Sequence, residues 1–86
     1  MHNQFSLKIL TQDSLVYEGP VLSLVVPATY GYLGVLANHA PLITNLKQGR
    51  IIIKDASGRQ MIVNNISKGF LEVLKNKAVI LLDSVD

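Results

Sequence analysis

The sequence predicts an all-β fold, either a sandwich or a barrel built from short strands. Runs of β-branched and aromatic residues recur along the chain, separated by turn-forming residues roughly every eight to twelve positions. No window of helical length repeats its apolar residues with the period of an amphipathic helix. Both observations favour many short strands over helices.

Three strands are expected in the first third of the chain. Ser6–Leu10 is the first, and a polar cluster after Leu10 closes it. Leu15–Glu18 is the second and should end at Gly19-Pro20, because glycine and proline interrupt regular structure. Val21–Val26 is the third, rich in β-forming residues, and stops before a proline.

The stretch from Gly31 to Leu42 is expected to form a compact corner around which the other strands are organised. Two glycines, Gly31 and Gly34, lie three residues apart and allow unusual backbone angles or close backbone contacts. Pro41 drives the residue before it out of the helical region. The stretch is therefore predicted to be a turn between strands, positioned to present a loop to a partner.

The second half of the chain contains the remaining strand candidates. Asp55–Gly58 is predicted to be a hairpin loop, and Lys75–Lys77 a tight turn. With no repeat or linker evident, residues 1–86 are expected to form a single domain. The predicted strands are Leu42–Leu46, Arg50–Lys54, Gln60–Val63, Gly69–Leu74 and Ala78–Leu82.

The composition indicates a subunit that a partner completes. Hydrophobic residues make up 49% of the chain and charged residues only 16%. This apolar content is high for a domain of only 86 residues. A domain of this size buries only a little over 60%, roughly, of its unfolded surface, so apolar patches should remain exposed. The net charge of +2 is too small for a protein that tracks nucleic-acid phosphates. No cysteine, signal peptide or membrane-spanning run is present, so a soluble, cytoplasmic protein is expected.

His39 is the residue most suggestive of catalysis. A histidine general base needs an orienting carboxylate and a nucleophile, but the spacing of the acidic residues singles out no partner for it. We therefore expect His39 to bond to backbone groups inside the corner and regard a His39-dependent hydrolase only as a third alternative. His2, near the chain terminus, is not expected to join it in a metal site. Neither catalytic, metal nor cofactor-binding residues are predicted.

A small nucleic-acid-binding barrel is the alternative from another class. The five aromatic residues could stack bases on one face, as single-strand-binding proteins do. No stripe of basic residues runs between them, which favours core packing or a protein interface instead. The glycines likewise form no phosphate-binding signature, because no helix N-terminus follows Gly31-x-x-Gly34. The aromatic residues are Phe5, Tyr17, Tyr30, Tyr32 and Phe70.

Several motifs follow one another in order across nearly the whole chain. They are Val25-Val26-Pro27, Gly31-Tyr32-Leu33-Gly34-Val35-Leu36, His39-Ala40-Pro41-Leu42-Ile43-Thr44, Leu46-Lys47-Gln48-Gly49, Ser67-Lys68-Gly69-Phe70-Leu71-Glu72-Val73 and Ala78-Val79-Ile80-Leu81-Leu82-Asp83. Together these motifs resemble the epsilon subunit of the rotary F-type ATP synthase. The resemblance implies a flattened β-sandwich of two packed sheets with about ten strands.

The resemblance also implies a function without catalysis. The epsilon subunit sits in the central stalk, binds the gamma subunit and the c-ring, and couples proton-driven rotation to ATP synthesis. It is peripheral to the cytoplasmic face of the bacterial inner membrane, or to the equivalent organellar membrane. Gamma contacts are expected at Leu36, Asn38, His39, Ala40, Pro41 and Leu42, and c-ring contacts at Thr29, Tyr30, Gly31 and Tyr32.

Three departures from the family pattern bear on these expectations. Tyr30 and Tyr32 flank Gly31, where family members often carry acidic residues. Asn38 stands where they often have glycine, and asparagine tolerates the same left-handed backbone conformation. The inhibitory C-terminal helical hairpin of most members is expected to be absent from this chain.

Overall fold

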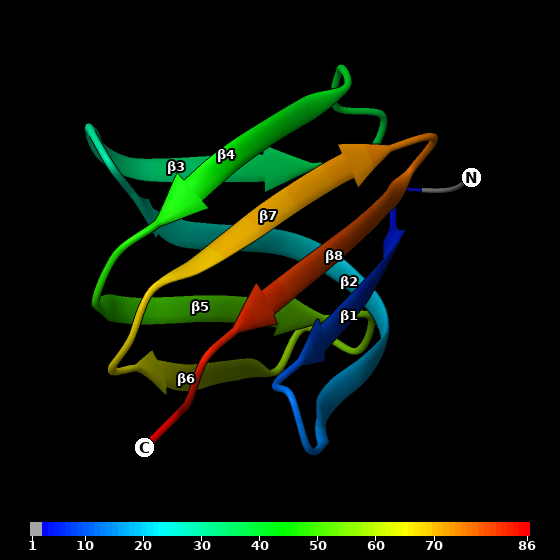
Figure 1. The fold of residues 1–86 in the computed structure, drawn as a ribbon. Coiled ribbons are helices and arrows are strands. Elements are labelled where there is room, and N and C mark those ends of the chain that lie inside the picture. Colours follow the sequence, from blue (N-terminus) through cyan, green and yellow to red (C-terminus); the bar gives the residue numbers. More distant parts are fainter. Residues whose placement is uncertain (1–2) are drawn as a thin grey trace.

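The computed structural model describes residues 3–86, and within them it contains eight strands and no helix (Figure 1). The all-β prediction is therefore confirmed for the described residues. The strands are β1 (Phe5–Leu10), β2 (Leu15–Ala28), β3 (Gly31–Leu36), β4 (Leu42–Leu46), β5 (Gly49–Asp55), β6 (Gln60–Asn65), β7 (Gly69–Leu74) and β8 (Lys77–Leu82).

The strands form two layers packed face to face (Figure 1). One layer contains β4, β7, β8 and β1, with β1 and β8 pairing in parallel. The other contains β3, β2, β5 and β6, all antiparallel. β2 joins the layers because its first half pairs with β1 and its second half pairs with β5 and β3. The predicted β-sandwich is thus one hydrogen-bonded sheet folded over itself.

β2 accounts for part of the difference between the eight strands observed and the roughly ten implied by the family resemblance. The predicted break at Gly19-Pro20 is wrong, because both residues lie inside a 14-residue strand. Proline lacks a backbone N–H, so a sheet tolerates it where a neighbouring strand does not need that donor. Pro20 pairs with Ser6 of β1, and the next residue, Val21, pairs with both β1 and β5. The Pro20 carbonyl accepts the Ala56 N–H at 3.2 Å.

The core lies between the two layers and is entirely aliphatic apart from Phe5. Strands alternate inward and outward side chains, so the buried residues of β1, β5, β7 and β8 fall two positions apart. Leu24, on β2, is fully buried and lies opposite Val35 of β3 and Ile53 of β5. The core therefore joins strands that are far apart in sequence.

The predicted loop between β5 and β6 is present and is fixed by one aspartate. Asp55 Oδ1 accepts hydrogen bonds from the Ser57 hydroxyl at 2.6 Å and from the Arg59 and Ser57 N–H groups, both at 2.9 Å. The Ser57 hydroxyl, followed by the Arg59 backbone, holds the pKa of Asp55 below its ordinary value.

We expect Asp55 to make stability depend on pH in the acid range. A lowered native pKa means that its contribution is full above the unfolded pKa of about 3.9 and is lost as pH falls through the native pKa. Asp55→Asn should therefore flatten the fall of the urea midpoint on acidification. Asp13→Asn, on the exposed β1–β2 loop, is the control. An unchanged slope in Asp55→Asn would contradict this assignment.

Candidate functional site

The stretch from Gly31 to Leu42 is not the compact corner that its glycines predict. Residues 31–36 form β3, and only residues 37–41 form a loop. The glycines permit an extended strand here, and pairing with β2 from Ala28 to Ser23 imposes it. The residues expected at the c-ring therefore lie at one end of β3, and those expected at gamma lie at the other. Five strand steps separate Gly31 from Leu36, a distance of about 17 Å.

The loop after β3 is held by a hydrogen bond to a residue 38 positions later in the chain. Asn38 adopts a positive φ of 64°, as expected for an asparagine in a glycine position. Its N–H donates to Asn76 Oδ1 at 2.7 Å. His39 Nδ1 donates to the Ala40 carbonyl at 2.7 Å, which confirms the expected backbone bond. The histidine is thus occupied in shaping the loop.

Asn76 is a residue that sequence reasoning missed as part of this site. It lies in the predicted turn between β7 and β8, where Lys75 and Asn76 both have positive φ, typical of a type I′ hairpin. Its Nδ2 also donates to the Gln4 carbonyl at 2.9 Å. One side chain therefore ties the chain start, the β3–β4 loop and the β7–β8 turn together. Local sequence signals the turn, but not these distant partners.

The six expected gamma residues differ in what they offer to a partner. Leu36 is 64% exposed at the end of β3, and Asn38, Ala40 and Pro41 are exposed as well. Leu42 is only partly exposed and packs against the core. Leu36 is therefore the large apolar side chain of this set that is available for contact.

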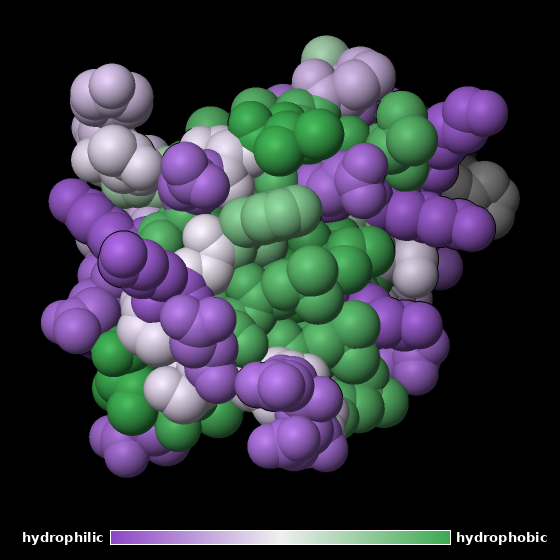
Figure 2. Space-filling view, viewed as in Figure 1, coloured by the Kyte–Doolittle hydropathy of each residue, from purple (hydrophilic) through white to green (hydrophobic). Residues whose placement is uncertain are grey.

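Apolar side chains also gather on the outer face of the layer formed by β4, β7, β8 and β1. Figure 2 shows a continuous apolar area across this face, with polar residues around it. Phe70 on β7 lies opposite Leu81 on β8 in the sheet register. This uncovered surface agrees with the apolar excess of the sequence. The large exposed residues on it are Ile43, Phe70, Leu74 and Leu81, between 38% and 69% exposed.

The opposite end of β3 is a hairpin tip with one free aromatic ring. Thr29 and Tyr30 form a two-residue turn between the paired residues Ala28 and Gly31. The Tyr30 ring is fully exposed. The Tyr32 hydroxyl accepts the Arg50 N–H at 3.3 Å, so this ring folds back onto the sandwich.

Gly49 explains why the Tyr32 ring can lie so close to the sheet. A Cβ at this position would lie 3.0 Å from the Tyr32 hydroxyl oxygen and 2.8 Å from the Pro27 Cβ. Glycine leaves that space empty, and its φ of 151° is one that other residues rarely adopt. Tyr30 is therefore the fully exposed ring of the tip, whereas Tyr32, which is 60% exposed, is held at its hydroxyl end.

The remaining candidates of the sequence are scattered over residues 3–86. No group of three or more His, Cys, Asp or Glu side chains suited to a metal occurs in that range. His2 lies outside the described residues. The aromatic side chains are dispersed, since Phe5 is buried, Phe70 lies on one layer and the tyrosines lie elsewhere. Within the described range, no helix is long and apolar enough to cross a membrane.

Comparison with known proteins identifies the family. The model of the ATP synthase delta/epsilon chain β-sandwich domain matches residues 4–86. The ATP synthase epsilon chain of Dichelobacter nodosus is 37% identical over 83 residues, which cover 96% of this chain and 57% of the relative. The epsilon chain of Latilactobacillus sakei is 41% identical over 83 residues, which cover 94% of this chain and 57% of the relative. The chain thus spans under three-fifths of the length of these curated relatives.

Solved structures show the same fold. A chain in the mitochondrial ATP synthase of Euglena gracilis, solved as OSCP, F1 and c-ring, aligns with a TM-score of 0.90 at 22% identity, covering all of this chain and 54% of its own. A chain in the central stalk and c-ring of the Tetrahymena thermophila enzyme aligns with a TM-score of 0.75 at 14% identity, covering 94% and 64%. With the family model matched over nearly every residue, the chain belongs to the ATP synthase delta/epsilon chain family and carries its β-sandwich domain.

Proposed function

We propose that this chain is an epsilon-type rotor subunit of an F-type ATP synthase. It binds gamma and the c-ring and couples proton-driven rotation to ATP synthesis without catalysing a reaction itself. It is peripheral to the membrane, on the cytoplasmic face in a bacterium. The family match over residues 4–86 carries the proposal, together with the relatives' name, ATP synthase epsilon chain.

Gamma is proposed to bind at the end of the sandwich that contains Leu36 and the 37–41 loop. Hydrogen bonds of Asn38 and His39 fix the loop before gamma binds. Association with gamma therefore loses little conformational entropy in this loop. Leu36 supplies an exposed apolar anchor at this end of the sandwich, and Ile43 on β4 is also exposed. Co-purification of the chain with the gamma subunit tests the proposal, and failure of the two proteins to associate would overturn it.

The c-ring is proposed to contact the hairpin tip through Tyr30, with Thr29, Gly31 and Tyr32 supporting it. Tyrosine combines a large apolar ring with a hydroxyl group and is common in the centres of interfaces. An exposed ion pair in the same place would contribute only about 0–1 kcal/mol and would be screened by salt. Aromatic packing at this tip should therefore give contact that is nearly independent of salt.

We expect Tyr30→Ala to weaken binding of the chain–gamma complex to purified c-ring by roughly five- to thirtyfold, the range for a moderate interface anchor. Tyr32→Phe keeps the ring that lies against Gly49 and removes only the hydroxyl, so it should bind like the wild type. Binding is measured for all three over a series of salt concentrations. Wild-type binding that collapses as salt rises, or Tyr30→Ala binding at full strength, would contradict the aromatic contact.

A further inference from the structure

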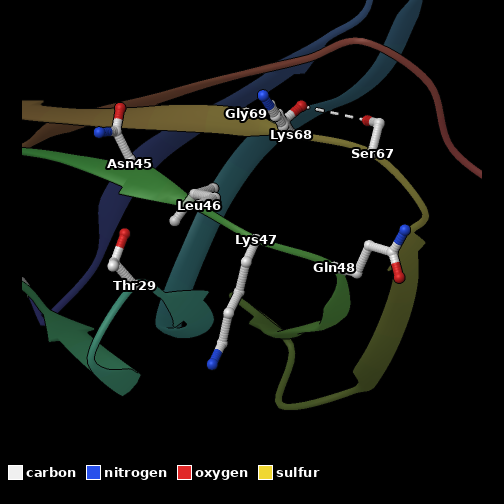
Figure 3. Close-up of a pocket in the computed structure, with 8 residues that line it drawn as sticks. All are labelled: Thr29, Asn45, Leu46, Lys47, Gln48, Ser67, Lys68 and Gly69. Atoms are coloured by element: carbon white, nitrogen blue, oxygen red, sulfur yellow. Dashed lines mark hydrogen bonds between the residues drawn. The ribbon is translucent and has the colours of Figure 1, made fainter.

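A cavity of about 580 Å³ opens at the same end of the sandwich as the hairpin tip (Figure 3). Its volume falls within the range of roughly 300–1,000 Å³ that is usual for small-ligand sites. Three connections meet there: the β2–β3 turn, the β4–β5 loop and the β6–β7 loop. The lining residues are Thr29, Asn45, Leu46, Lys47, Gln48, Ser67, Lys68 and Gly69.

The cavity combines apolar lining with positive charge and a few polar side chains. None of its lining residues is acidic, and two of them are lysines. In the described part of the chain, neither the Lys47 nor the Lys68 ammonium has a carboxylate oxygen within 4.0 Å. Asp83 lines the adjoining hollow beside Lys68 instead. A lining of this kind favours an anion with several acceptor oxygens.

The frame around the cavity is fixed by hydrogen bonds that do not use the lysine ammoniums. Asn65, only 2% exposed, donates to the Lys47 carbonyl at 2.9 Å and accepts from the Ser67 N–H at 3.1 Å. Gln48 Nε2 donates to the Ile66 carbonyl at 3.1 Å, and the Lys47 N–H donates to the Pro27 carbonyl at 2.8 Å. The two lysine-bearing loops are thus joined to each other, which lowers the cost of ordering them around a ligand.

Close packing of β7 against β8 at Gly69 forms one wall of the cavity. A Cβ at Gly69 would lie 2.6 Å from the Leu81 carbonyl oxygen, so only glycine fits at this wall. In Figure 3, Lys68 lies above Leu46, the Lys47 side chain extends below it and away from Lys68, and Thr29 and the upward-pointing Asn45 amide lie to the left. Each lysine ammonium sits on a flexible four-carbon stem and can move over the opening when an anion enters.

We propose that this cavity binds a phosphate group, with Lys47 and Lys68 neutralising its charge and Thr29 and Asn45 donating hydrogen bonds. Lysine ammoniums are common phosphate ligands because they act as compact charges with several donors. The phosphate group belongs either to a soluble phosphorylated molecule or to a phospholipid headgroup. The site is formed by this chain alone and shares Thr29 with the proposed c-ring contact, so its binding is measured on the free chain.

Titration with inorganic phosphate, followed by amide chemical shifts at constant ionic strength, tests the site directly. We expect shifts concentrated on the lining residues. Lys47→Gln/Lys68→Gln should weaken binding at least tenfold, whereas the control Lys54→Gln/Lys77→Gln, with the same loss of charge, should change it less than twofold. Asn45→Leu keeps the net charge and should also weaken binding. Equal weakening in both double variants, or shifts spread over all lysines, would overturn the proposal.

Vesicle binding distinguishes the two sources of the phosphate. Sedimentation with phosphatidylglycerol vesicles, compared with sedimentation with phosphatidylcholine alone, is measured for the wild type and both double variants. Phosphatidylglycerol binding lost only in Lys47→Gln/Lys68→Gln assigns the site to a lipid headgroup. Inorganic phosphate binding without vesicle binding assigns it to a soluble ligand. Absence of both kinds of binding overturns the proposal, while the dispersed amide spectrum of each variant confirms that it is folded.

Discussion

Leu36→Asp is expected to abolish co-purification with gamma while leaving the fold intact. The Leu36 side chain is 64% exposed. The aspartate carboxylate at this position would therefore be hydrated in the free chain and should lower the free energy of unfolding only slightly. In a complex with gamma, the same carboxylate would be buried without a partner. Loss of an anchor residue of this kind typically reduces the binding free energy by at least about 2 kcal/mol, which corresponds to roughly thirtyfold weaker affinity.

Leu15→Asp is the matched control for this experiment. Leu15 is 53% exposed and begins β2, next to the β1–β2 loop. The substitution therefore introduces the same charge at a similar exposure in a region that the proposal does not use. Leu42 would be a poor test position, because it packs against the core and its replacement would also destabilise the domain. Full-strength gamma binding by a folded Leu36→Asp chain would show that gamma binds elsewhere.

Leu24→Ala should cause the largest loss of stability among the changes considered. The side chain is fully buried and lies between β3 and β5 near the middle of β2. Truncating a buried leucine removes transfer free energy and leaves a cavity, at a typical cost of about 2–5 kcal/mol. That is a large fraction of the roughly 5–15 kcal/mol that stabilises an ordinary domain.

Urea unfolding measures this effect, with Leu15→Ala as the control. Removing the half-exposed Leu15 side chain should change the free energy of unfolding by less than about 1 kcal/mol. The urea midpoint should fall for Leu24→Ala with little change in the slope m, since the exposed surface of the unfolded chain is nearly the same. Equal midpoints for the two variants would mean that the core has repacked around the lost side chain.

Much of the fold follows from local sequence signals. The bounds of β4 and β7 are those that their apolar runs and flanking turn residues predict, and the β5–β6 loop lies where Asp55–Gly58 predicts it. The bounds of β2 and β3 could not be predicted from local signals in the same way. Gly19-Pro20 and the two glycines of β3 are turn signals, but pairing with neighbouring strands outweighs them. Such pairing depends on the whole sheet and is not visible in a short window.

In the candidate site, too, features set by adjacent residues could be predicted and features set by residues on other strands could not. The left-handed backbone of Asn38 and the backbone bond of His39 could be predicted, because both depend on adjacent residues. The different roles of Tyr30 and Tyr32 could not be, since Tyr32 folds onto Gly49 and Arg50 of another strand. The tie through Asn76 likewise joins residues from three separate parts of the chain.

The parallel pairing of β1 with β8 has a consequence for synthesis on the ribosome. Residues 6–10 must wait for residues 77–81, about seventy positions later, before that side of β1 gains its partner. At roughly 5–20 residues per second, the wait lasts several seconds. The emerging chain can form the local β1–β2 and β5–β6 hairpins, but it cannot close the sandwich. A nascent chain that stalls before Lys77 would therefore expose an open strand edge to other chains, a substrate suited to chaperones.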